Sequence, residues 1–168
     1  MSKNKFSKFI ESMANKQMTI SITALALIIA LNLYEIIIRA FLDKSIIWIQ
    51  EVSVLFMVWM IFCGFTKIVY ENKNINIELL VDNLPKKVKN ITNLFTKIII
   101  VVFLVIFSYY GFFLLSEQIG IGTYTSNIPK TLYTFPVILN SVSVLLIYIN
   151  NIYNDIILLR NGGENKWK

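Results

Sequence analysis

Residues 48–67, WIQEVSVLFMVWMIFCGFTK, form an almost uninterrupted apolar run with one charged residue near each end, Glu51 and Lys67. As an α-helix, the segment between these two charges would span about 24 Å. The hydrocarbon core of a bilayer is about 30 Å thick, so Glu51 and Lys67 would lie near opposite membrane boundaries. Neither would sit at mid-membrane, where an ionisable side chain indicates a proton or ion path. The stretch therefore predicts a membrane-spanning helix whose charges mark its two ends.

Four apolar segments of this kind occur along the chain, at residues 18–38, 49–70, 98–115 and 135–157. Each comes close to the length of about 20 residues that a spanning helix needs. Apolar side chains make up 56% of the sequence and charged ones only 15%, against about 25% charged in a typical soluble domain. We expect an all-α integral membrane protein, with residues 1–168 forming a single membrane domain. The first segment is too long, and lacks the small-residue cleavage site, for a cleavable signal peptide.

The composition argues against most enzyme chemistry. The chain has no histidine, which removes His-metal sites and Ser-His-Asp catalysis, and its single cysteine, Cys63, cannot form an intramolecular disulfide. It also carries no nucleotide-binding glycine motif and no metal-ligand cluster. We expect no catalytic residue, no metal ion and no cofactor, and a buried Cys63 that acts as a small apolar residue.

The basic residues predict the orientation of the chain. Thirteen of the 16 Lys and Arg residues lie before the first span, between the second and third, or after the fourth. Cytoplasmic segments of membrane proteins are enriched in Lys and Arg, so both termini and the middle connection are predicted to be cytoplasmic. The net charge of +6 is therefore attributed to membrane orientation, and nucleic acid is not an expected partner.

The connection before the third span is predicted to contain one or two amphipathic helices, within residues 75–97, that lie in the inner membrane interface. Pro85 can begin a helix because its missing N–H is not needed in a first turn. Four lysines would face the lipid headgroups, namely Lys67, Lys86, Lys87 and Lys89. The alternative is that this segment is a cytoplasmic extension of the third span.

Charged and aromatic residues also gather near the outer ends of the first two spans. Glu35 and Arg39 are four residues apart on one helix face, and Arg39 could instead pair with Glu51 across the turn. These residues, together with Trp48, either cap the hairpin locally or contact a partner subunit. Trp59 lies within the second span, where it could face lipid or anchor helix packing.

Small and polar residues within the spans predict helix–helix contacts, either within the four-helix bundle or with a larger partner, because they allow close backbone approach or interhelical hydrogen bonds. The candidates are Ala26 and Ala30 in the first span, Ser108 and Gly111 in the third, and Asn140, Ser141 and Ser143 in the fourth.

Several of these residues together resemble a known family, the small membrane subunit (DctQ/SiaQ-like) of tripartite ATP-independent periplasmic (TRAP) transporters. The shared features are Arg39, Trp48-x-x-Glu51, Phe56-x-Val58-Trp59-x-x-Phe62-x-Gly64, I-x-I-E-L-L-V-x-x-L-P over 75–85, and Tyr133-x-x-Pro136. The resemblance covers roughly residues 18–157. Asn72 and Asn74 stand where many relatives have Gly and His.

This resemblance implies a scaffold subunit in the inner membrane of a bacterium. Its partners would be a large membrane subunit, which carries the substrate and sodium sites and forms a heterodimer with it, an extracytoplasmic substrate-binding protein, and membrane lipids. The transported substrate would be an organic acid, with sialic acid expected first and a C4-dicarboxylate second. Trp48, Glu51 and Arg39 would then organise the outer end of the first hairpin at a subunit contact.

Two other classes of protein remain as alternatives. A homo-oligomeric four-helix exporter would need a deeply buried acidic residue, for which Glu35 is the available candidate. A membrane enzyme would need a nucleophile with its base, or a metal set, and the sequence offers neither.

Overall fold

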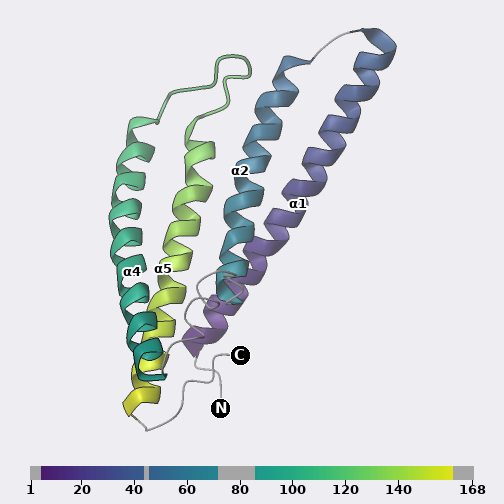
Figure 1. Cartoon of the computed structure of the whole chain (residues 1–168). Helices are drawn as coiled ribbons and strands as arrows, with labels where there is room; N and C mark the ends of the chain where they lie inside the picture. Colours follow the sequence, from purple (N-terminus) through teal and green to yellow (C-terminus); the bar gives the residue numbers. More distant parts are fainter. Residues whose placement is uncertain (1–4, 44–45, 72–85, 161–168) are drawn as a thin grey trace.

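The computed structural model describes residues 5–43, 46–71 and 86–160, apart from the side chains of 86–91, 93 and 158–160. This part of the chain forms four long helices, α1 (Lys5–Leu42), α2 (Ile47–Tyr70), α4 (Lys86–Glu117) and α5 (Thr131–Arg160) (Figure 1). Each helix contains a segment long and apolar enough to cross a membrane. The predicted all-α membrane architecture with four spans is therefore confirmed.

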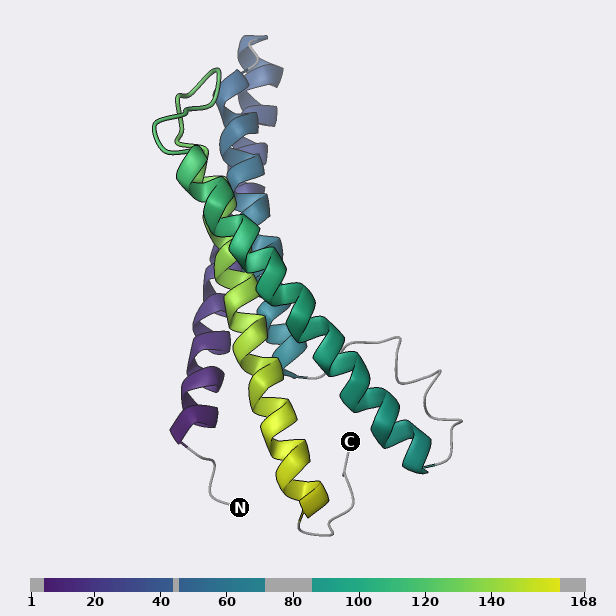
Figure 2. The same ribbon diagram turned by 90° about the vertical axis from the view of Figure 1, so that its left-hand side faces the viewer.

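The helices form two antiparallel pairs. One end of the molecule is where α1 and α4 end and where α2 and α5 begin (Figure 1). We call it the hairpin end, and we call the opposite end the terminal end. The strongest contacts join α1 with α2, α4 with α5, and α2 with α5, so the helices follow the order α1, α2, α5, α4. α1 slants across the terminal end to reach α5, whereas α4 diverges from the other helices there (Figure 2).

α1 begins 13 residues before the predicted start of the first span, because a buried helical stripe extends beyond the apolar run. From Ile10 to Ala24 the stripe repeats every three or four residues, through Ala14, Gln17 and Ser21, and Glu35 is buried eleven residues further along. Ile10 packs with Val69, Val144 and Ile147 in the apolar core of the terminal end. The hydropathy pattern located the apolar run correctly. α1 itself is longer than this run, because its buried face continues toward the N-terminus.

Residues 86–97 form the first turns of α4 and run without a break into its spanning part. This half of the predicted interfacial segment is thus an extension of the third span, as the alternative interpretation expected. The other half, including Pro85, lies outside the described residues.

Polar side chains join the helices within the bundle. Asn140 of α5 donates to the Phe62 carbonyl and to Thr66 Oγ1 of α2, at 2.7 and 2.8 Å. Three more hydrogen bonds link α1 to α5, α1 to α2, and α4 to α5: Gln17 Nε2 to Ser143 Oγ (2.6 Å), Ser21 Oγ to the Met60 carbonyl (2.7 Å), and Ser108 Oγ with Ser141 Oγ (2.9 Å). The predicted contacts of Ser108, Asn140, Ser141 and Ser143 are confirmed.

The small-residue pair predicted in the first span does not take part in contacts within the bundle. Ala26 and Ala30 are exposed, whereas Ala14 and Ala24 are buried. The side chain of Ser21 also belongs to the buried face, where it lies against Gly64 of α2. A pair of small residues four positions apart identifies a possible contact, but the surrounding stripe decides which face is used.

Candidate functional site at the hairpin end

Glu51, in the first turns of α2, binds the connection between α4 and α5. Its Oε2 accepts hydrogen bonds from Thr123 Oγ1 (2.9 Å) and the Ser126 N–H (2.9 Å), and its Oε1 accepts one from the Thr125 N–H (3.0 Å). Tyr133 of α5 also donates to the backbone carbonyl of Glu51, at 2.9 Å. We call these five residues the Glu51 hub, and hydrogen bonds to a carboxylate are among the strongest in proteins. The hub fastens α2 to the second helical pair.

The connection bound by Glu51 has its own internal order. Its two arms meet at an isolated bridge between Gly122 and Pro129, and the Thr123 N–H donates to the Ile128 carbonyl at 2.9 Å. Asn127 adopts a left-handed conformation, with φ of 51°, at the turn. Asn tolerates this conformation better than most residues, so Asn127 favours a turn at this position of the loop.

Trp59 compensates for a proline in α5. Pro136 lies inside α5 and has no N–H to donate to the carbonyl of Leu132, four residues earlier. The Trp59 Nε1–H donates to that carbonyl instead, at 3.1 Å, and the ring lies 6.0 Å from that of Phe135. Of the two interpretations left open by the sequence, a packing anchor fits this contact.

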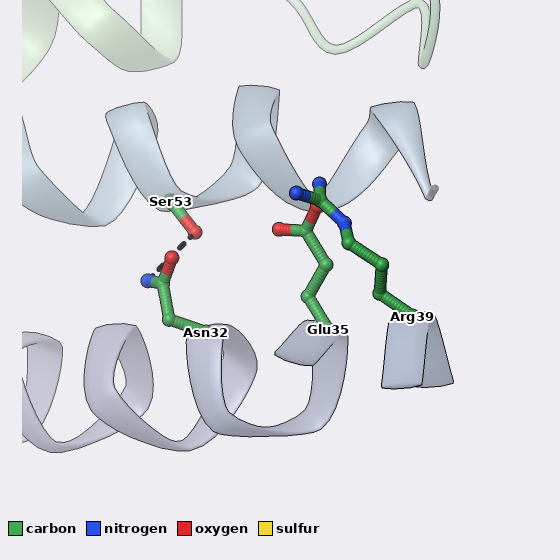
Figure 3. A network of polar contacts seen from close by, with 4 residues as sticks. All are labelled: Asn32, Glu35, Arg39 and Ser53. Atoms are coloured by element: carbon green, nitrogen blue, oxygen red, sulfur yellow. Dashed lines mark hydrogen bonds and ion pairs between the residues drawn. The ribbon is translucent and has the colours of Figure 1, made fainter. Parts of the chain in front are cut away.

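Glu35 and Arg39 form the predicted pair on α1, with Arg39 Nη2 and Glu35 Oε1 2.8 Å apart. Glu35 is buried, whereas the Arg39 side chain remains 58% exposed. Figure 3 shows the pair one turn from Asn32, which contacts Ser53 of α2. A buried carboxylate near a membrane boundary requires such a partner, because an isolated charge is costly to desolvate.

The predicted outer-rim residues therefore divide into separate groups. Glu35 and Arg39 pair on α1, while the Glu51 carboxylate turns toward the α4–α5 connection instead of meeting Arg39 across the turn. Trp48 is about half exposed in the first turn of α2. The sequence placed these residues at the correct end of the helices but could not show that Glu51 serves the other helical pair.

Among the lysines predicted to face lipid headgroups, Lys67 contacts protein groups. Its Nζ donates to Asn15 Oδ1 at 2.6 Å, pairs with Glu71 at 3.2 Å, and lies 5.3 Å from the centre of the Tyr70 ring. Lys67 thus joins the terminal end of α2 to α1. The side chains of Lys86, Lys87 and Lys89 lie outside the described residues.

One buried ion pair at the terminal end was not predicted from the sequence. Lys97 Nζ of α4 lies 2.6 Å from Asp155 Oδ2 of α5, and the side chains are only 12% and 10% exposed. The signal available in the sequence was Asp155, an acidic residue inside the fourth apolar segment. Polar contacts therefore hold the α4–α5 hairpin at both ends, with the Glu51 hub at the hairpin end and this ion pair at the terminal end.

The described contacts give these polar groups structural roles. Glu35, Glu51 and Asp155 each face a specific protein partner near one end of a helix. Within the described residues, no group of three or more His, Cys, Asp or Glu side chains could hold a metal ion. The arrangement can position helices and a loop, and it leaves large apolar side chains exposed on all four helices.

Comparison with known proteins supplies an identity for this arrangement. A family model described as "Tripartite ATP-independent periplasmic transporters, DctQ component" matches residues 28–158, which is well over half of the chain. A Haemophilus influenzae protein named "Putative TRAP transporter small permease protein" is 25% identical over 112 residues. The aligned region is 67% of this chain and 65% of that relative, so the chain spans slightly less than two thirds of the relative's length.

Proposed function

The chain belongs to the DctQ component family of tripartite ATP-independent periplasmic transporters and is a multi-pass protein of the bacterial inner membrane; from this premise we propose that it is a scaffold for transport. In this proposal it forms a heterodimer with a large membrane subunit that carries the sodium and substrate sites. The transported substrate is an organic acid, sialic acid first and a C4-dicarboxylate second. This choice of substrate and the sodium coupling rest on the family resemblance alone.

The Glu51 hub carries the scaffold proposal. A residue that moves a proton or ion must change its partners during transport, whereas the Glu51 carboxylate is occupied by three donors from one loop. The hub holds that loop at the end of the bundle predicted to face outward. An ordered outer loop next to exposed Trp48 and Tyr124 is a suitable surface for docking the extracytoplasmic binding protein.

The contacts of Glu35 argue against the exporter alternative. This carboxylate is paired with Arg39 one turn away on the same helix and lies near the hairpin end of α1. A proton-coupled exporter would need an acidic residue that binds its cargo deep in the membrane. We therefore keep a single proposed function.

The first experiment is a mild-detergent purification of the tagged chain from its native membranes, followed by mass spectrometry. We expect a stoichiometric, much larger multispanning protein to purify with it. Recovery of the chain only as a stable homodimer would contradict the proposal.

Glu51→Ala provides a functional version of this test. We expect less recovered complex and slower sodium-driven uptake of sialic acid or a C4-dicarboxylate in proteoliposomes. Glu117→Ala is the matched control, because this exposed glutamate ends α4 at the same end of the molecule. Normal assembly and unchanged uptake by Glu51→Ala would remove Glu51 from the proposal.

A further inference from the structure

Asn32 places a carboxamide on the exposed surface of α1 at a depth where lipid tails would surround it. It lies seven residues before Arg39, about 10 Å along the helix, and 17 residues after Asn15, about 25 Å. Asn15 binds Lys67 at the terminal end, so Asn32 falls inside the hydrocarbon layer that these two boundaries enclose. Its side chain is nonetheless exposed.

Other exposed polar groups on α1 are satisfied by their own helix. The hydroxyls of Thr19 and Thr23 donate to the carbonyls four residues earlier, at 3.2 and 2.9 Å. Asn32 Nδ2 likewise donates to the Ile28 carbonyl at 2.7 Å and reaches Ser53 Oγ at 3.5 Å (Figure 3). Both contacts use the amide nitrogen, so the carboxamide oxygen can still accept a hydrogen bond at the surface. Lipid tails have no donor to offer it.

The surface around Asn32 is a continuous apolar face of the α1–α2 pair. Ser53 and Met57 are four residues apart and share one face of α2. The contact between Asn32 and Ser53 therefore places this face of α2 beside the Asn32 side of α1. Arg39 follows Asn32 by two turns and leaves a cationic group at the hairpin end. We call this surface the Asn32 face; its exposed members are Leu25, Ile29, Asn32, Ile36 and Arg39 of α1, and Val54, Met57 and Ile61 of α2.

We propose that the Asn32 face is the docking surface for a transmembrane helix of the large membrane subunit, an inference that rests on the proposed function. The chemistry of the face specifies that helix. It is apolar and it carries a hydrogen-bond donor at the depth of Asn32. A lipid tail would match the apolar side chains but would leave the carboxamide oxygen without a hydrogen-bond donor.

The first test replaces the carboxamide. Asn32→Leu should weaken association of the two subunits, titrated in nanodiscs, by roughly three- to fifteen-fold, as expected for one interhelical hydrogen bond. Tyr110→Phe is the matched control, since it removes an exposed polar group from α4, at the other edge of the row. Thermal unfolding of the isolated Asn32→Leu chain should match the wild type, because the residue is exposed. Unchanged subunit affinity in Asn32→Leu would overturn the proposal.

The second test maps the face by photo-cross-linking in native membranes. A photoreactive phenylalanine analogue is placed at Ile36 or Met57 on the Asn32 face, or at Ala30 or Phe103 as exposed controls on the far side of α1 and on α4. The large subunit should be captured from Ile36 and Met57 but not from the controls. Capture only from the controls would overturn this face and leave the proposed function intact. Adducts with lipid alone from all four positions would overturn this face, and adducts only with a second copy of the chain would contradict both the face and the proposed function.

Discussion

At the level of single residues, Glu51 joins segments that lie far apart in the sequence. One carboxylate in α2 binds three donors from a loop that is more than 70 residues away in sequence. The sequence predicted that Glu51 lies at a boundary, because the apolar run begins beside it. It could not predict the partners, since Thr123, Thr125 and Ser126 form no recognisable motif.

Glu51→Gln should loosen this loop while keeping the size of the side chain. An amide has one acceptor oxygen, and its NH₂ group would face an N–H donor that the carboxylate now satisfies. We expect amide hydrogen exchange at Thr125 and Ser126 to accelerate on the order of tenfold, as local opening becomes easier. Glu117→Gln should leave both amides unchanged. Full protection of the two amides in Glu51→Gln would show that the loop is ordered without the hub.

At the level of helices, α1 and α2 pack closely where Gly64 meets Ser21. A Cβ atom added at Gly64 would lie 2.8 Å from Ser21 Oγ, which is closer than van der Waals contact allows. Gly64→Ala should therefore destabilise the chain by about 1–3 kcal/mol, measured by unfolding in detergent. The double variant Gly64→Ala with Ser21→Ala should regain much of this loss, because the next atom is 3.6 Å away. A double variant as unstable as Gly64→Ala would contradict the steric explanation.

The ion pair between α4 and α5 allows a second test at this scale. Lys97→Met alone would leave the Asp155 carboxylate buried without its ion-pair partner and should cost about 3–5 kcal/mol, to be compared with the double variant Lys97→Met with Asp155→Leu. The double variant should recover most of that stability, because it removes both buried charges. Equal loss in the single and double variants, in the same unfolding assay, would show that the pair itself is not the cause.

The helices were predictable because the 20-residue apolar segments are local features. The ends of the helices were less predictable, because α1 extends beyond the apolar run along a buried face that includes Ile10 and Ala14. Pairings between helices were largely beyond prediction. Lys97 and Asp155 are 58 residues apart, and their contact depends on how α4 and α5 align along each other. Tyr133 and Trp59 likewise gain their roles only once α5 lies beside α2.

At the level of the whole molecule, the four helices form an open row rather than a closed bundle (Figures 1 and 2). α4 packs chiefly against α5, and α1 against α2, so each outer helix leaves much of its surface exposed. This shape suits a protein that is completed by a partner in the membrane. It also places the start of α1 and the end of α5 at the same end, in agreement with an even number of spans.

The predicted orientation of this row can be tested by labelling single cysteines. Cys63 is buried, so the wild-type chain should resist a membrane-impermeant maleimide. Tyr124→Cys should react in intact spheroplasts because Tyr124 is fully exposed at the predicted outer end. Lys8→Cys should react only after permeabilisation. The reverse pattern would show that the termini face outward.

The Glu51 hub also has a consequence for folding during synthesis. The first helical hairpin is synthesised well before the loop that satisfies Glu51, so the nascent chain carries an unmatched carboxylate at the membrane surface. The same hairpin exposes Trp59 before Leu132 exists to receive its N–H. Arrival of the second hairpin satisfies both groups at once. A chain truncated before that point would leave both groups unsatisfied.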